Sequence, residues 1–113
     1  MTIREGEEIF APVKIVDVNT DLGRYQADDL RETLDELVSQ KAEKIIVNLS
    51  GVQHINSTAV GTLVSIVKQL RQKNGDLKVY GLGDNVKRVF DLIGASSILE
   101  IYDSESSAIA AFK

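Results

Sequence analysis

The segment Val52–Gly61 holds the residues of this chain that are best suited to chemistry. It places the hydroxyls of Ser57 and Thr58 where an amphipathic stretch begins after a β-branched apolar run. Backbone N–H groups in the first turn of a helix lack helical partners, and the helix dipole favours an anion there. A phosphoryl group on Ser57 would gain local hydrogen bonds and add roughly two negative charges. The segment therefore predicts either a phosphorylation switch or simply a helix cap formed by Asn56, Ser57 or Thr58.

A second segment, Gly81-Leu82-Gly83, follows an expected strand and opens an expected helix, which is the context of a dinucleotide-binding turn. Val86 occupies the position of the third glycine, while Asp103 lies about twenty residues on, where a ribose-binding acid would sit. Too little chain follows this segment to build the rest of a dinucleotide-binding domain. The pattern favours a glycine turn before a capped helix over a nucleotide site.

The remaining polar residues form no catalytic constellation. His54 has no Cys or Ser–Asp arrangement to complete a nucleophilic site, and a half-exposed loop histidine is expected. The acidic side chains of Asp28, Asp29, Asp35 and Glu36 fit the solvated face of a helix better than an acid–base pair. We therefore expect no catalytic residue and no enzymatic activity.

Composition excludes several kinds of site. The 113 residues include no cysteine and one histidine, which excludes disulfides, thiolate zinc sites, cysteine nucleophiles and multi-histidine metal centres. Lys plus Arg is 13 and Asp plus Glu is 17, and the net charge of −4 suits neither duplex nucleic acid nor an anionic membrane. No apolar stretch has transmembrane length, and the acidic N-terminus does not resemble a signal peptide. We expect a cytoplasmic protein without membrane insertion, bound nucleic acid, cofactor or metal.

Hydrophobic periodicity predicts one α/β domain over residues 1–113. A short polar edge strand is expected near Ile3, and further strands are expected at Val13–Val18, Lys44–Leu49, Leu77–Tyr80 and Ser97–Tyr102. Helical patterns separate these strands, an alternation that favours a mostly parallel sheet with right-handed crossovers.

About four helices are expected between and after the strands. The first spans Ala27–Ser39, with Asp28 and Asp29 in its first turn. The second ends at Asn74-Gly75, and the third runs from a cap at Asp84 or Asn85 to Gly94; the last follows a cap at Asp103 or Ser104. The side chains expected to face inward from the last three helices are those of Val60, Leu63, Val64, Val67, Leu70, Val86, Val89, Phe90, Ile93, Ala108, Ala111 and Phe112.

The order of these segments resembles the STAS domain, and within it the anti-sigma factor antagonists. The resemblance covers the chain from about Val13 to Phe112. Lys44–Val52 is similar to the family's strand followed by L-S-G-V, and Ile55–Gly61 is similar to its I-D-S-S/T-G-L-G motif. Further matches are Asn74-Gly75, Val86–Gly94 and Ile101–Ser104.

The resemblance implies a small, mixed, mostly parallel sheet packed by helices, and a reversible partner switch. In that switch the unphosphorylated domain binds an anti-sigma factor, commonly an ATP-using serine kinase, and so frees the sigma factor. Phosphorylation of Ser57, with Thr58 as the fallback acceptor, abolishes binding, and a serine phosphatase restores it. The residues expected to contact the partner are Gly23, Arg24, Tyr25, Asn56, Ser57, Thr58 and Val60.

Two segments depart from the family's pattern. Asn56 stands at the aspartate of the serine motif, with Ala59 at its first glycine. In the loop before the first helix, Thr20 and Gly23 replace the glycine and the aspartate of a G-x-L-D pattern. An alternative function is a STAS adaptor of a stress-signalling or transport complex, in which Ser57 is only a helix cap.

Overall fold

The computed structural model describes residues 1–6 and 12–112. The elements follow one another as β1 (Thr2–Gly6), β2 (Val13–Asp17), α1 (Arg24–Ser39), β3 (Lys44–Asn48), α2 (Ser57–Arg71), β4 (Asp76–Tyr80), α3 (Asp84–Ile93), a 3-10 turn (Ala95–Ser97), β5 (Glu100–Tyr102) and α4 (Glu105–Ala110).

The strands form one mixed sheet in the order β1-β2-β3-β4-β5. The edge strand β1 pairs antiparallel with β2, and every other neighbouring pair is parallel. Ile45, Ile46 and Val47 in the central strand β3 are fully buried, because helices cover both faces of the sheet there. The structure confirms the mostly parallel sheet and the edge strand expected near Ile3.

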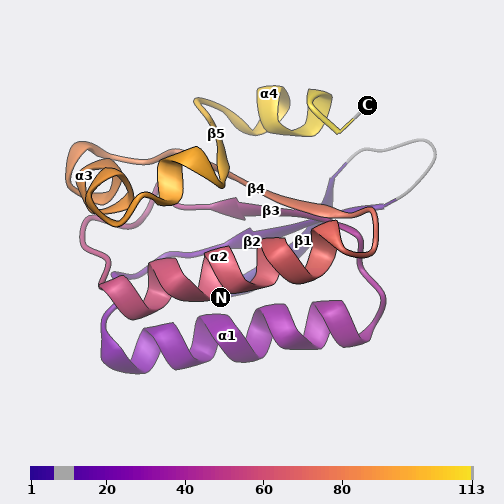
Figure 1. Ribbon diagram of the computed structural model, residues 1–113, viewed down its shortest axis with the longest axis horizontal. Coiled ribbons are helices and arrows are strands. Elements are labelled where there is room, and N and C mark those ends of the chain that lie inside the picture. Colours follow the sequence, from indigo (N-terminus) through magenta and orange to yellow (C-terminus); the bar gives the residue numbers. More distant parts are fainter. Residues whose placement is uncertain (7–11, 113) are drawn as a thin grey trace.

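Helices of unequal size cover the two faces of the sheet (Figure 1). The long helices α1 and α2 lie side by side on one face, and the short helix α4 lies on the other. The main core lies between the sheet, α1, α2 and α3, while a smaller cluster of Val13, Ile15, Ile46, Tyr80 and Ala108 lies beneath α4. None of the helices in the described part of the chain is long and apolar enough to cross a membrane.

Two predicted boundaries were wrong. Helix α1 begins at Arg24 instead of Ala27, so its first turn holds no acidic residue and Asp28 lies in the second turn. The earlier start follows from Gly23, whose carbonyl already accepts the amide of Ala27 at 2.9 Å. The last strand is limited to residues 100–102, because the Ser97 hydroxyl bonds to the carbonyl of Gly94 at 2.8 Å and stabilises a 3-10 turn instead.

Caps and inward faces agree with the prediction in most places. Gly94 ends α3 in the left-handed conformation with a φ of 85°, and Ser104 caps α4, whereas Gly83 caps α3 in place of Asp84 or Asn85. Ile93 and Ala111 are exposed, because the first lies in the last turn of α3 and the second lies beyond the end of α4. The buried face of α2 also includes Thr62 and Ile66, which the prediction omitted.

Candidate functional site

The expected partner-contacting residues come together where two loops meet after β2 and β3. The amide of Leu22 donates to the carbonyl of His54, and the amide of Asn56 donates to the carbonyl of Leu22, both at 2.9 Å. This short parallel bridge joins the residues that precede α1 to those that precede α2. It brings the start of α1, at Gly23–Tyr25, beside the start of α2.

Asp21, in the loop after β2, accepts hydrogen bonds from the loop after β3. Its Oδ1 atom accepts hydrogen bonds from the backbone amides of Gln53 at 2.8 Å and His54 at 3.2 Å. The bond from Gln53 is the main cause that lowers the pKa of the Asp21 carboxyl below its ordinary value, and the bond from His54 adds to this effect. The side chain of His54 is exposed, as expected for a loop histidine. The sequence pattern did not indicate Asp21, because a single acidic residue in a loop has no distinctive spacing.

Asn56 caps α2. Its backbone is extended, with φ −93° and ψ 167°, and its Oδ1 atom accepts the amide of Ala59 at 2.8 Å. Of the three residues that the sequence predicts as possible caps, Asn56 is the one that caps the helix in the structure. Ser57 is the first residue of the helix, and its hydroxyl is free of the capping role.

Ser57 and Thr58 are both exposed in the first turn of α2. Among the hydrogen bonds of the described residues, neither of their backbone amides has an acceptor in the protein. The carbonyl of Thr58 accepts the hydroxyl of Thr62 at 3.1 Å. No Asp, Glu, Lys or Arg occurs from residue 45 to residue 67. An anion attached at Ser57 would therefore meet two free N–H groups and the positive end of the helix dipole, with no acidic residue on the same helix turn.

The structure disagrees with one of the expected contact residues. Val60 is 0% exposed and belongs to the main core, so it cannot reach a partner. Its position on α2 points it toward the sheet, whereas Gly61, the next residue, is exposed. On α1, Arg24 is exposed and Tyr25 is 75% exposed, so both side chains are available to a partner.

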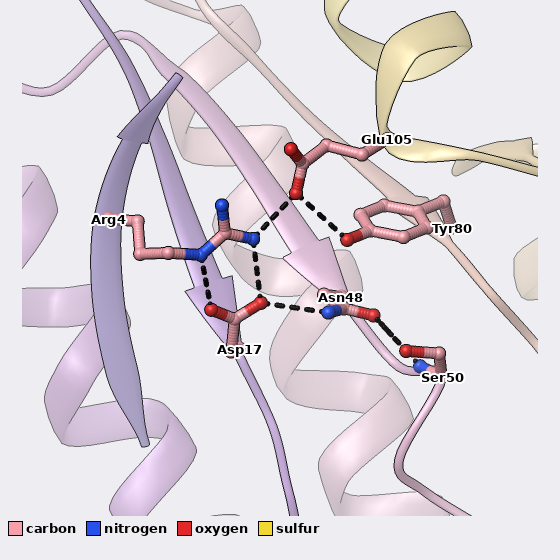
Figure 2. Close-up of polar contacts among 6 residues, drawn as sticks. All are labelled: Arg4, Asp17, Asn48, Ser50, Tyr80 and Glu105. Carbon is pink, nitrogen blue, oxygen red and sulfur yellow. Dashed lines mark hydrogen bonds and ion pairs between the residues drawn. The ribbon is translucent and has the colours of Figure 1, made fainter.

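A polar network lies at the same end of the sheet (Figure 2). The guanidinium of Arg4 on β1 pairs with Asp17 on β2 and with Glu105 at the start of α4, each at 2.5 Å. The Arg4 hydrogen bond is the main cause that lowers the pKa of the Asp17 carboxyl, and likewise that of Glu105. Burial, reinforced by a 3.0 Å hydrogen bond to Glu105, raises the pKa of Tyr80 to about 12.

Asn48 connects this network to the loop that leads to Ser57. Its Nδ2 atom donates to Asp17 at 2.8 Å, and its Oδ1 atom accepts the amide of Ser50 at 3.0 Å and the hydroxyl of Ser50 at 2.6 Å. Both hydrogen-bonding groups of the Asn48 amide are thus used, which orients the side chain. The loop that begins at Ser50 is therefore fixed at its start by Asn48 and further along by Asp21.

Comparison with known proteins identifies the family. Residues 5–108 match the family model of the STAS domain. The chain belongs to the STAS domain family. It is 30% identical over 98 residues to an anti-sigma F factor antagonist of Paenibacillus polymyxa, a match that covers 86% of this chain and 84% of that protein.

A second relative and a solved structure agree with this assignment. An anti-sigma-B factor antagonist of Listeria monocytogenes is 31% identical over 85 residues, which cover 75% of each chain. The crystal structure of TM1081 from Thermotoga maritima superimposes on this STAS domain with a TM-score of 0.82 and 29% identity, covering 88% of this chain and 86% of that one.

Gly23 and Asn56, which stand where the family's pattern has aspartates, are both helix N-caps in this STAS domain. Gly23 is the N-cap of α1 and makes no side-chain cap bond, and Asn56 is the N-cap of α2. The 22–55 bridge places these two caps side by side. Both replacements keep a residue type that suits an N-cap, and both remove a negative charge from the surface around Ser57.

The Gly81-Leu82-Gly83 turn has a structural explanation in this STAS domain. Gly81 has a φ of 80°, and a Cβ atom there would lie 2.9 Å from the Cβ of Ser50, so glycine is needed for both backbone and space. Asp103 is exposed in the turn between β5 and α4. In the part of the chain that the structure describes, no cluster of three or more acidic or histidine side chains is able to hold a metal ion.

Proposed function

We propose that this STAS domain is an anti-sigma factor antagonist whose binding is switched off by phosphorylation of Ser57. The observation that carries the proposal is the free, exposed hydroxyl of Ser57 at the start of α2, next to a cap formed by Asn56. The names of the two curated relatives support the class of partner. The domain would act in the cytoplasm, where sigma factors bind RNA polymerase.

In this function the domain is the substrate of a kinase and performs no catalysis itself. The Oγ atom of Ser57 attacks the γ-phosphorus of ATP bound to the anti-sigma factor kinase. The new Oγ–P bond forms as the bond from the γ-phosphorus to the bridging oxygen breaks, ADP leaves, and the hydroxyl proton passes to a base of the kinase. A serine phosphatase reverses the modification by hydrolysis of the Oγ–P bond.

The local electrostatics give the modification a large effect on binding. Helix α2 carries no ionisable side chain before Lys68, so a phosphoryl group on Ser57 would add roughly two negative charges to a stretch of the helix that has none. The phosphate gains hydrogen bonds from the free amides of Ser57 and Thr58 and a favourable interaction with the helix dipole. The helix therefore tolerates the phosphate, while a partner packed on it would have to desolvate the added charge.

Substitution at Ser57 tests the switch. The probes are the anti-sigma factor kinases encoded by the protein's own host, each purified and titrated with the wild type, Ser57→Ala, Ser57→Asp and Thr58→Ala. We expect one kinase to bind the wild type, Ser57→Ala and Thr58→Ala, to reject Ser57→Asp, and to phosphorylate Thr58→Ala but not Ser57→Ala. Equal binding of Ser57→Ala and Ser57→Asp would contradict the switch and favour the constitutive adaptor.

A further inference from the structure

A small apolar pocket lies where α1 and α2 end, at the other end of the domain from Ser57. The two helices run side by side in the same direction, so they also end together (Figure 1). Val38 in the last turn of α1, Ala42 in the loop after it and Leu70 in the last turn of α2 line a pocket of about 250 Å³. At roughly 30 Å³ for each water-sized group, this volume holds about eight non-hydrogen atoms. The pocket therefore has the size of a small molecule.

The ionisable residues of the pocket lining are two lysines and one glutamate. Lys41 and Lys73 contribute two positive charges and Glu43 one negative charge, so the lining has a net charge of +1. Both lysines are exposed, and neither forms an ion pair with another residue in the part of the chain that the structure describes. Their ammonium groups are therefore available to an anion in the pocket.

The pocket lies in a basic part of an acidic chain. Residues 41–44 and 68–78 carry six Lys or Arg side chains and two Asp or Glu side chains. The rest of the chain carries 7 basic and 15 acidic side chains, out of totals of 13 and 17. Such a separation of charge raises the local concentration of anions at the basic end. The charge distribution thus favours an anionic ligand at this end of the domain.

Lys41 stands at a backbone position that favours glycine. Its φ is 66°, in the left-handed region, where a side chain with a Cβ atom is strained. The amide of Lys41 donates to the carbonyl of Val38, and the amide of Ala42 donates to that of Leu37, each at 3.0 Å. Backbone groups thus close the end of α1 without the lysine side chain. A strained residue whose side chain the fold does not need points to a ligand.

We propose that this pocket binds a small monoanion that consists of a carboxylate and a short aliphatic chain. The chain packs against Val38, Ala42 and Leu70, and the carboxylate accepts hydrogen bonds from the ammonium groups of Lys41 and Lys73. A net lining charge of +1 matches a carboxylate better than a phosphate dianion. The site lies at the far end of α2 from Ser57, so the inference does not depend on the proposed function.

Titration with sodium hexanoate tests the site, because this anion has about eight non-hydrogen atoms. Proton–nitrogen correlation spectra report on the backbone amides of Val38, Ala42 and Gly75, which belong to the lining. We expect their shifts to saturate with a Kd on the order of 1 mM. Acetate lacks the chain and protonated hexylamine reverses the charge, so each should bind at least about tenfold more weakly.

Two substitutions separate a binding role of the lysines from a structural one. Lys41→Gly removes an ammonium group and places glycine at the left-handed position, so the melting temperature should not fall. Lys73→Ala removes the second ammonium group. Each variant should raise the Kd for hexanoate by at least about fivefold. Lys87→Ala, at an exposed position of α3 outside the lining, is the matched control and should bind like the wild type.

Three results would overturn the proposal. The first is a set of wild-type shifts that do not saturate below about 50 mM hexanoate. The second is equal affinity for hexanoate and for acetate or hexylamine, and this comparison decides the matter even if a lysine variant fails to fold. The third is a Kd for both lysine variants equal to that of Lys87→Ala. None of these results bears on the phosphorylation of Ser57.

Discussion

The Oδ1 atom of Asn56 accepts a 2.8 Å hydrogen bond from the amide of Ala59, and this contact assigns the capping of α2 to Asn56. Ser57, the next residue, is thereby left with an exposed hydroxyl and a free backbone amide. Cap and proposed phosphorylation site are adjacent but distinct residues. The two roles can therefore be separated by substitution.

Asn56→Ala should destabilise the domain by about 1 kcal/mol, because it removes the side-chain acceptor of the cap. Ser57→Ala should change the free energy of unfolding by less than about 0.5 kcal/mol, since its hydroxyl makes no cap bond. Urea denaturation of both variants measures the difference. Asn56→Asp, which keeps a cap oxygen, is the control and should unfold with nearly the wild-type free energy. A larger loss for Ser57→Ala than for Asn56→Ala would show that the cap is misassigned.

Leu63→Ala should lower the free energy of unfolding by roughly 2–5 kcal/mol, since the side chain is 0% exposed in the main core. The exposed position Gln69 on the same helix provides the control, because Gln69→Ala removes no buried contact. Chemical denaturation of the two variants gives the comparison. A Leu63→Ala protein as stable as Gln69→Ala would show that Leu63 does not lie on the buried face of α2.

Stability should fall in acid partly because of Glu100. Its Oε2 atom accepts a 2.6 Å bond from Lys78, a residue only 4% exposed, and this bond is the main cause that lowers the pKa of Glu100 from 4.5 to about 2. A carboxyl with a depressed folded pKa contributes its full stabilisation above its unfolded pKa. The contribution is therefore present above about pH 4.5 and is lost as the pH falls toward 2.

Glu100→Gln provides the comparison for this acid transition. Unfolding free energies of the wild type and the variant, measured between pH 7 and 2, should differ most at neutral pH and converge toward pH 2. The Glu100 side chain is half-exposed, so solvent screening reduces the effect. A constant difference between the two proteins over the whole range would contradict the assignment.

Asp21→Ala should loosen the loop that leads to Ser57 without unfolding the domain. The substitution removes the acceptor of the Gln53 and His54 amides, which then exchange with solvent through local opening. Hydrogen–deuterium exchange should show faster exchange at these two amides and unchanged protection in β3. Asp28→Ala, at an exposed position of α1, is the control. Equal protection of the Gln53 and His54 amides in the variant and in the wild type would show that Asp21 does not fix this loop.

The sequence predicts the order of the elements because each has a strong local signal. The β-branched run around Ile46 and the periodic apolar residues of α2 both give elements where they are expected. The start of α1 is missed by three residues because Gly23, the cap, has no side chain to signal it. The split of the segment 97–102 is missed because a serine hydroxyl bonds to the local backbone, a preference that apolar periodicity does not report.

The sequence predicts which segment of the chain forms the candidate site, but it does not predict which residues from elsewhere in the chain contact that segment. The Asn56–Thr58 segment indicates a helix start, and the structure places it there. Periodicity correctly predicts that Val60 faces inward, so the contact with a partner that the resemblance implied for Val60 is wrong. Asp21 and Asn48 act through partners 32 and 31 residues away in sequence, and spacing along the chain carries no information about such pairs.

We propose above all that Ser57 is phosphorylated and that this modification controls binding. Phosphopeptide mapping of the protein isolated from its own host, in growth and under stress, tests it most directly. We expect phosphate on Ser57 at an occupancy that changes with the condition, in material that includes the unmodified peptide as an internal reference. A fully sampled Val52–Gly61 segment without phosphate in every condition would contradict the switch.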